Sequence, residues 1–439
     1  MWLRPGVAVT KPSADELGRW GARIPPAKIS SVVCDALDEG LLSDGAAFFH
    51  DLDRLDARVG RLQSLFPAST LHGIAVKANP AVPLLRHLVG RGCGLECASM
   101  EEVELCLAAG CAPDRIIFDS PAKSPAEIEL ALHRGLWLNA DNPEELARVA
   151  RWVEAHGPPT GVVGLRINPL VGAGSIPTTS VGDRASKFGV PVSQRAEIVQ
   201  LFGQYPWLGA LHVHVGSQGC ALSKLSEGAA VAVALAAEIE AELSRPPSSI
   251  AIDVGGGLPT SYLESDNPPS LEAYVESLSS IEGLHTRPLA TEFGRAVHAN
   301  CGFAVSRVEY IKEVEGTQFA VIHLGADAFM RPVYQPQHWP HELILLDEHG
   351  QPKQAEPKTV SVAGPLCFGG DIIAGACSLP SPAVGDWLVL RDTGAYTLSL
   401  WSRHCSRAMP AMHGFSGGTR FTTLKRRETV ADLVALWGG

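Results

Sequence analysis

Short apolar runs alternate with longer amphipathic segments between Ala46 and Arg295. The short runs are rich in β-branched and aromatic residues. The longer segments carry apolar residues three and four positions apart, and several begin with Ser or Asn. This alternation is typical of repeated β/α units around a parallel sheet. The runs expected to form strands are AAFFH, HGIAVKA, GLECAS, RIIFDS, LWLNAD, VVGLRINP, GALHVHVGS, SIAIDVGGG and LATEFGR.

These strand candidates number nine, one more than an eight-stranded β/α barrel needs. Either the first, AAFFH, belongs to a second domain, or one of the nine is not a strand. After Cys301, apolar runs such as FAVSRVEYIK and DWLVLRDTG lie between Gly and Pro turns, which indicates an antiparallel β-domain. The expected fold is α/β, with an eight-stranded TIM-like β/α barrel at residues 45–310. Residues 1–44 together with 311–439 are expected to form a mostly antiparallel β-domain.

Composition narrows the class of protein. A chain of 439 residues with 46% hydrophobic and 19% charged residues is expected to fold compactly as one large barrel or two domains. Its net charge of -11 repels phosphate backbones and anionic lipids, so no nucleic-acid or membrane partner is expected. Pro5 and Lys11 interrupt the apolar start, and the run from Gly228 to Ala237 is too short to span a bilayer. We therefore expect a soluble, cytoplasmic protein, in which most of the ten cysteines are reduced and buried in the core.

The candidate catalytic and binding residues lie where the expected strands end. Lys77, His214, Ser217 and Glu292 each stand at or just after the end of an apolar run, as do the three glycines 255–257. In a β/α barrel these strand ends form the mouth that carries the chemistry. The pattern therefore predicts that they meet in one site.

Lys77 closes the apolar run HGIAVKA and precedes an Asn-Pro turn. A lysine desolvated by apolar neighbours loses its proton more easily, and the neutral amine can form a Schiff base with an aldehyde. The structural alternative is a lysine that extends to solvent. The surrounding motifs decide between the two.

Two further motifs complement the lysine. In HVHVGSQG and IDVGGGLP, glycines at strand ends allow backbone N–H groups to approach an anion, and Ser217 can add a donor, so together they resemble a phosphate cup. In TEFGRAVH, Glu292 can hold a proton on a heteroaromatic nitrogen. Taken singly, a glycine run is more often a turn, and a Glu–Arg pair is more often structural.

A lysine for an aldehyde, a cup for a phosphate and a carboxylate for a ring nitrogen match the three handles of pyridoxal 5′-phosphate (PLP). From FFHDLDRL to GAYTLSLWSRHCSR, the chain resembles the alanine-racemase-fold (fold type III) PLP decarboxylases, the family of diaminopimelate, ornithine and arginine decarboxylases. The resemblance covers nearly the whole chain. It implies a PLP-dependent carboxy-lyase that releases CO₂ from the α carbon of an amino acid or an amino-acid-derived intermediate.

The resemblance also implies roles for individual residues. Lys77 would bind PLP covalently, and Glu292 would bond the pyridinium nitrogen. Cys367, in GPLCFGGD, resembles the cysteine that returns a proton to the α carbon. Because the family delivers this cysteine from the partner subunit, a homodimer with shared active sites is implied. The other cofactor-binding positions would be His214, stacked on the ring, and Ser217, Gly255, Gly256, Gly257, Gly294, Arg295 and Tyr396 around the phosphate.

Substrate recognition departs from the family pattern. Arg331 and Tyr334, in MRPVY, resemble the RPxLY segment that grips a distal carboxylate, with a spacing one residue shorter. Where diaminopimelate and ornithine enzymes carry an acidic residue for a distal ammonium, this chain has Phe368. An altered specificity is therefore expected, with carboxylated siderophore or secondary-metabolite precursors and D-amino acids as candidates. The implied substrate-binding set is Arg295, Arg331, Tyr334, Phe368 and Tyr396.

A metal-dependent barrel hydrolase is one alternative. His212 and His214, at i and i+2 on one strand face, can ligate zinc. His323 and Asp327 would have to supply further ligands, but both follow the expected barrel strands. No metal is therefore expected.

Two relatives of the same fold are also open. A racemase must deprotonate the α carbon, and the presence of Glu292 and Cys367 favours decarboxylation instead. A non-catalytic relative that binds a regulatory partner is the other, and retention of Lys77 and Cys367 argues against it. Phe368 keeps that second alternative open.

Overall fold

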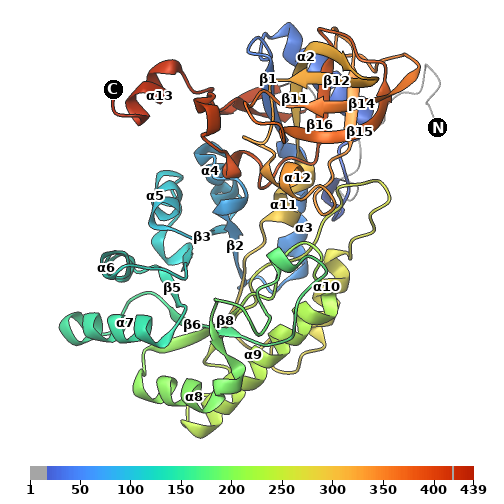
Figure 1. Ribbon diagram of the computed structural model, residues 1–439. Coiled ribbons are helices and arrows are strands. Elements are labelled where there is room, and N and C mark those ends of the chain that lie inside the picture. The colour runs from blue at the N-terminus through green and yellow to red at the C-terminus, as the bar shows by residue number, and fades with distance from the viewer. Residues whose placement is uncertain (1–16, 418–419) are drawn as a thin grey trace.

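The structure is a computed structural model and describes residues 17–417 and 420–439. Pro5 and Lys11, which interrupt the apolar start of the sequence, lie outside these residues. The described chain forms two sheets, which Figure 1 shows as a lower body of helices and strands and an upper body of strands. Among the described helices, none combines the length and the apolar character needed to cross a membrane.

The lower body is a closed barrel of eight parallel strands, which confirms the expected fold. The last strand, β10, pairs with the first, β2, and closes the ring. A two-residue strand, β7 (Val190–Pro191), pairs with β6. The barrel strands are β2 (Leu71–Ala75), β3 (Gly94–Cys97), β4 (Ile116–Asp119), β5 (Trp137–Ala140), β6 (Val163–Asn168), β8 (Leu208–Val213), β9 (Ala251–Asp253) and β10 (Leu289–Thr291).

The helices around the barrel begin at side-chain caps that the sequence signalled. Ser99, Ser124 and Asn142 each accept a hydrogen bond from the backbone three residues further on, which satisfies an otherwise unpaired N–H. The three capped helices are α5 (Met100–Ala108), α6 (Pro125–Arg134) and α7 (Pro143–His156). The others are α3 (Leu52–Leu65), α4 (Val82–Gly90), α8 (Arg195–Gln204), α9 (Leu222–Glu242) and α10 (Leu271–Ser279).

The upper body is a nine-stranded, mostly antiparallel sheet. Its strand β1 (Ala46–Asp51) pairs antiparallel with β11 (Gly302–Val314) and parallel with β17 (Ala411–Ser416). The expected strand AAFFH thus lies in the upper sheet and not in the barrel. Strands of the upper sheet therefore occur inside the range 45–310 that was expected for the barrel. The others are β12 (Thr317–Ile322), β13 (Leu343–Leu346), β14 (Pro357–Ala363), β15 (Ile372–Pro380), β16 (Trp387–Arg391) and β18 (Arg420–Lys425).

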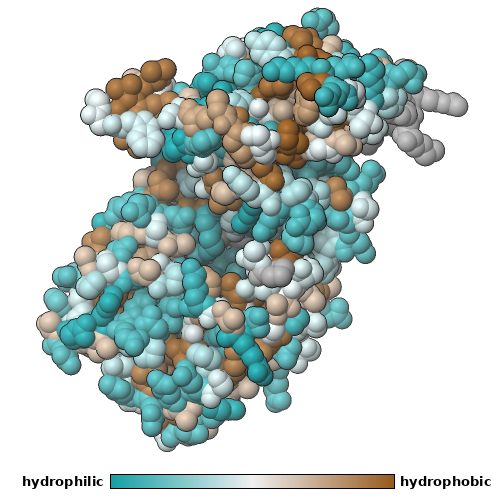
Figure 2. All heavy atoms as spheres, viewed as in Figure 1, coloured by the Kyte–Doolittle hydropathy of each residue, from teal (hydrophilic) through white to brown (hydrophobic). Residues whose placement is uncertain are grey.

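Short helices complete the upper body. Helix α2 (Pro26–Asp38) packs its buried face against the upper sheet, and α11 (Arg295–His298) and α12 (Met330–Tyr334) connect to strands of that sheet. Helix α13 (Val430–Leu436) extends away from it at the upper left of Figure 1. Figure 2 shows apolar side chains on this helix, and Trp437 at its end is 64% exposed. Within the described chain, this apolar end therefore remains uncovered.

The barrel interior is built in two layers. An apolar cluster at its base joins side chains from five strands. Because side chains two residues apart in a strand point to the same face, the residues two positions further on lie one layer above, toward the carboxyl ends of the strands. Those residues are polar, so the sequence places a buried polar layer directly above an apolar floor. The pairs are Ile117 and Asp119, Trp137 and Asn139, Ala210 and His212, Ala251 and Asp253, and Ala290 and Glu292.

Candidate active site

A cavity of about 400 Å³ lies above this polar layer. Segments of the upper body, around Arg331 and Tyr396, line it together with the ends of the barrel strands. The structure thus brings together most of the site that the sequence predicted. The expected residues that line the cavity are Lys77, His214, Ser217, Gly257, Glu292, Gly294, Arg295, Arg331 and Tyr396.

Lys77 lies two residues after the end of β2, and its Nζ lies 2.5 Å from Glu96 Oε1, near the end of β3. Desolvation acts to lower the pKa of Lys77, but the carboxylate of Glu96, with smaller contributions from Tyr396 and Glu292, raises it overall. Burial raises the pKa of Glu96 to about 8, against the opposing effect of Lys77. The carboxylate of Glu96 thus outweighs desolvation and favours the ammonium form of Lys77, which is the opposite of the easier loss of a proton that the sequence predicted. Sequence reasoning missed Glu96, although this residue is a charged side chain within the apolar run GLECAS, near the end of its strand.

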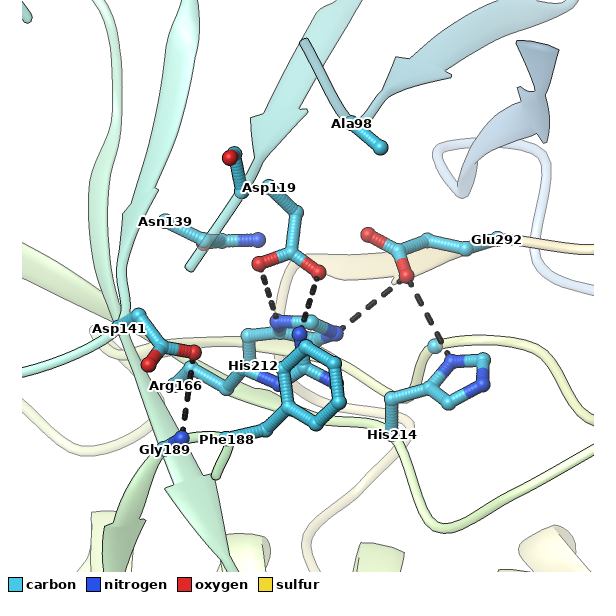
Figure 3. Close-up of polar contacts among 12 residues, drawn as sticks. Ala98, Asp119, Asn139, Asp141, Arg166, Phe188, Gly189, His212, His214 and Glu292 are labelled. Atoms are coloured by element: carbon cyan, nitrogen blue, oxygen red, sulfur yellow. Dashed lines mark hydrogen bonds and ion pairs between the residues drawn. The ribbon is translucent and has the colours of Figure 1, made fainter. Parts of the chain in front are cut away.

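A row of alternating charges lies behind the cavity (Figure 3). Arg166 donates to Asp119 Oδ2 at 3.0 Å, Asp119 Oδ1 lies 3.6 Å from His212 Nδ1, and His212 Nε2 lies 3.3 Å from Glu292 Oε2. Burial acts to lower the pKa of His212, but Glu292 and Asp119 raise it to about 9. Burial acts to raise the pKa of Glu292, but His212 lowers it well below its usual range. The row thus keeps Glu292 ionised.

One carboxylate oxygen of Glu292 has no hydrogen-bond donor among the described residues. Its Oε1 is buried and accepts no hydrogen bond within the described residues. Buried acceptors are rarely left unpaired, so this oxygen fits an N–H group supplied by a molecule bound in the cavity. His214, beside it, has Nδ1 at 3.8 Å from Glu292 Oε2 and accepts from the Gly256 backbone N–H at 3.2 Å. Burial lowers the pKa of His214 to about 3, so its ring is neutral.

Two glycines allow the loop after β9 to approach its neighbours closely. Gly255 has φ of +66°, and a Cβ there would lie 2.6 Å from Val213 O. At Gly257, with φ of +103°, a Cβ would overlap the Gly216 carbonyl. Only glycine adopts these angles without strain and leaves this room. The glycines that the sequence singled out thus make a cradle that any side chain would fill.

Arg295 and Arg331 both lie against the rings of Trp339 and Tyr396, and we call these four side chains the clamp. The guanidinium carbons of Arg295 and Arg331 lie 4.6 and 4.7 Å from the centre of the Trp339 ring, and 4.6 and 4.8 Å from that of Tyr396. Arg295 NH1 donates to Tyr262 Oη at 2.6 Å, whereas the buried Arg331 NH1 has no hydrogen-bond partner in the described chain. Burial and the neighbouring Arg295 lower the pKa of Arg331 to about 10. The clamp is therefore a site for anions.

Five expected residues do not line this cavity. Gly255 and Gly256 lie beside His214 in the glycine loop, whereas Tyr334, Cys367 and Phe368 lie apart from the cavity. Cys367 is exposed, and the Phe368 ring stacks on Tyr334 with centroids 6.2 Å apart and planes at 10°. Tyr334 itself is 65% exposed, and the residue that stands against Arg331 is Trp339, which the sequence did not single out. The missed Asp119 has a sequence signal, since it ends a strand like Glu292. Trp339 has none, because it reaches the site from an irregular loop.

The metal alternative finds only part of its ligand set. His212, His214 and Glu292 offer atoms within 4.8 Å of one another, all in the site just described. His323 instead contacts Glu309 at 3.0 Å in the upper sheet. Asp327 accepts from the backbone N–H groups of Gly325 and Ala328, so neither of the two further ligands that this alternative named joins the two histidines.

Comparisons with known proteins agree with this geometry. Residues 52–299 match the family model "Pyridoxal-dependent decarboxylase, pyridoxal binding domain". The diaminopimelate decarboxylase of Neisseria meningitidis serogroup A is 31% identical over 367 residues, which cover 82% of this chain and 86% of that protein. That of Deinococcus radiodurans is 31% identical over 392 residues, covering 88% and 94%.

A solved structure supports the same assignment. The crystal structure of diaminopimelate decarboxylase from Helicobacter pylori, complexed with L-lysine, matches with a TM-score of 0.80 and 26% identity, covering 89% of this chain and 96% of that chain. The lysine, the carboxylate and the glycine cradle therefore lie in the fold for which the sequence predicted them. The chain belongs to the pyridoxal-dependent decarboxylases, PLP-dependent carboxy-lyases of the diaminopimelate, ornithine and arginine decarboxylase type.

Proposed function

We propose that this decarboxylase acts on an amino acid whose distal end carries a carboxylate and needs no distal ammonium. The observation that carries the proposal is the clamp of Arg295 and Arg331, two neighbouring cations that no carboxylate of the described chain pairs. Buried cations are stable only when an anion compensates them. The cofactor phosphate compensates one of them, and the substrate compensates the other.

The cavity fits PLP at each of its handles. In the proposal Lys77 binds PLP covalently, and the unpaired Oε1 of Glu292 accepts the N–H of its ring. His214 stacks on the ring, which its neutral imidazole permits. The phosphate is held by Ser217, Gly255, Gly256, Gly257, Gly294, Arg295 and Tyr396.

The chain itself has three proton tasks. Bound PLP supplies an electron sink for the bond between the α carbon and its carboxylate. Lys77 must give up a proton from Nζ before its amine can add to a carbonyl group, and Glu96 Oε1, 2.5 Å away, takes that proton. Glu292 keeps the ring nitrogen protonated. Cys367 of a partner subunit returns a proton to the α carbon.

The distal end of the substrate is the point of departure from the relatives. An acidic residue after Cys367 would neutralise a distal ammonium, whereas the ring of Phe368 offers at most a cation–π contact. The guanidinium of Arg331 favours a carboxylate, which it can bind with two parallel hydrogen bonds. Carboxylated intermediates of secondary metabolism fit this description, in either configuration at the reacting carbon.

A comparison of three substrates tests this proposal. 2-Aminopimelate is diaminopimelate without its distal amino group, and ornithine lacks the distal carboxylate. We expect CO₂ release from 2-aminopimelate with kcat/KM at or above that of diaminopimelate, and at least about tenfold above that of ornithine, the worth of one charged hydrogen bond. Comparing the two enantiomers of 2-aminopimelate assigns the configuration. Faster turnover of ornithine would overturn the proposal.

A variant pair locates the carboxylate site. Arg331→Gln should lower kcat/KM for 2-aminopimelate by about 10- to 100-fold, because a charged hydrogen bond is lost. Arg307→Gln, at an exposed arginine of the upper sheet, should leave it unchanged. Equal losses for 2-aminopimelate and ornithine in the Arg331 variant would show that this residue does not read the distal end.

We also propose a homodimer with shared active sites. Cys367 and Phe368 do not line the cavity of their own chain, and exposed apolar side chains at Tyr334 and along α13 offer a surface that a second copy can cover. Lys77→Ala and Cys367→Ala homodimers should each be inactive. Co-expressed, they should recover about a quarter of wild-type activity, because half of the dimers carry one intact site of two. No recovery would place Cys367 in the site of its own chain.

A further inference from the structure

His212 is a buried titratable residue that the reaction has not yet used. It lies on β8, one layer below the cavity, and is 0% exposed. Figure 3 shows it between two carboxylates, with one ring nitrogen toward Asp119 and the other toward Glu292. A fully buried imidazole between two carboxylates is stabilised as its cation.

Every element that faces this imidazole carries a charge or a polar group. Glu292 follows β10 and Asp119 ends β4, while Asp253 on β9 accepts from Asn139 Nδ2 at 3.3 Å. Arg166 on β6 pairs with the far side of Asp119 and so keeps that carboxylate ionised. Burial and the charge of Glu292 raise the pKa of Asp253, which favours the neutral carboxyl group at this residue, whereas Asp119 and Glu292 are ionised. Lys77, Glu96 and His214 face Glu292 from the cavity side.

We propose that His212 is a positioning residue whose imidazolium holds Glu292 ionised and aimed at the cofactor ring, so that the shared proton stays on the ring nitrogen. The inference rests on the proposed role of Glu292. It extends the machinery of the reaction by three residues, His212, Asp119 and Arg166, of which only Asp119 and Arg166 touch the cavity.

The direction of the effect follows from the charges. Burial alone raises the pKa of a carboxyl group, which would favour a neutral pair of protonated Glu292 and unprotonated ring. A cation 3.3 Å from Glu292 Oε2 makes this carboxylate a weaker base, and the proton then belongs to the ring. A protonated ring is the stronger electron sink. His212 therefore acts on the chemical step and not on substrate binding.

His212→Gln tests the proposal, because glutamine keeps a polar contact to Glu292 without the charge. The holoenzyme is reconstituted with PLP labelled with ¹⁵N in the ring, and the ¹⁵N chemical shift reports ring protonation independently of activity. We expect the shift to move toward the unprotonated form. We also expect kcat to fall by about 10- to 100-fold, the usual cost of losing an outer partner that orients a reacting group, with little change in KM.

Asp119→Asn gives a second, graded test. The substitution removes the negative charge of Asp119, which lies beside His212 and raises its pKa, and it leaves Arg166 without this carboxylate partner. The pKa of His212 therefore falls. The ring ¹⁵N signal should then move toward the unprotonated form as pH rises through that lowered pKa, whereas in the wild type it should stay constant across the same range. A signal that depends on pH equally in both proteins would contradict the proposal.

Two controls separate the possible failures. His50→Gln removes a histidine that is 1% exposed in the upper sheet, so it carries the stability cost of losing a buried imidazole but should leave the ¹⁵N shift unchanged. Glu292→Gln should move the ring ¹⁵N signal completely to the position of the unprotonated ring. If Glu292→Gln leaves the shift unchanged, the proposed role of Glu292 fails. If Glu292→Gln shifts it and His212→Gln does not, only the role of His212 is refuted.

Discussion

Gly255→Ala is the substitution for which the structure gives the most specific prediction. Gly255 has φ of +66°, and an added Cβ would lie 2.6 Å from Val213 O and 2.9 Å from His214 Nδ1, where ordinary contact begins at 3.4 Å. Its carbonyl also accepts the Glu292 backbone N–H at 2.7 Å. A methyl group here therefore strains the backbone and displaces the neighbouring groups at the same time.

The magnitude has two parts. The left-handed conformation costs about 1–2 kcal/mol for a residue with a Cβ. Overpacking against the Val213 carbonyl and the His214 ring adds about 1–3 kcal/mol. The expected loss in the free energy of unfolding is thus about 2–5 kcal/mol. If the chain relieves the clash by moving Glu292 or His214, a shift on the order of 1 Å also costs about 100-fold in turnover.

Gly110→Ala is the matched control. Gly110 has φ of +85° but no atom within 4 Å of an added Cβ, so it carries the conformational cost of about 1–2 kcal/mol without the clash. Urea unfolding of both variants, PLP titration and kcat would be measured together. If Gly255→Ala loses no more stability than Gly110→Ala and retains wild-type PLP affinity and turnover, the close approach at this cradle does not matter and the reasoning is refuted.

Three further outcomes are expected. Lys77→Ala should lose the visible absorption band that PLP gives the wild-type protein, with an unchanged far-ultraviolet circular dichroism spectrum; a retained band would place the covalent bond elsewhere. Burial lowers the pKa of His298 from 6.5 to about 3, so the unfolded chain binds a proton that the folded chain does not. Stability should therefore fall as pH decreases below about 6.5, by up to about 1.4 kcal/mol per pH unit, and His298→Gln should flatten this loss in urea titrations at several pH values. Gly60→Ala, inside α3 with no atom within 4 Å of the new Cβ, should raise the free energy of unfolding by about 1 kcal/mol in the same assay, and a decrease would contradict the helix reading.

The sequence predicted the barrel well because its strands and helices differ in period. All nine expected strands exist, and the Ser and Asn caps start helices where expected. The sheet to which the run at 46–50 belongs could not be read, because β1 is buried on both faces and lacks the alternation that distinguishes sheets. Its partners β11 and β17 lie far along the chain, and periodicity does not reach that distance.

The candidate site divides in the same way. Lys77 and Glu292 were found because they end strands, and Glu96 and Asp119 carry the same signal, so the apolar–polar step within each strand could have identified them. The contacts of Trp339 with both arginines could not be found, since a loop places this residue. The segment around Arg331 suggested Tyr334 as its companion, but that side chain stacks on Phe368 instead.

The closure of the barrel between β10 and β2 has a consequence for how the protein is made. Lys77 and Glu292, on either side of this seam, emerge from the ribosome far apart in time, and Tyr396 emerges later still. Strand β1 likewise waits for β11 and β17. Chains fold domain by domain as they are synthesised. The barrel can close once β10, which ends at Thr291, has emerged, whereas the upper sheet must wait for β17 and β18, which end at Ser416 and Lys425. The side of the cavity that Arg331 and Tyr396 line therefore forms last, so we expect the complete cofactor site only when synthesis of the chain is nearly finished.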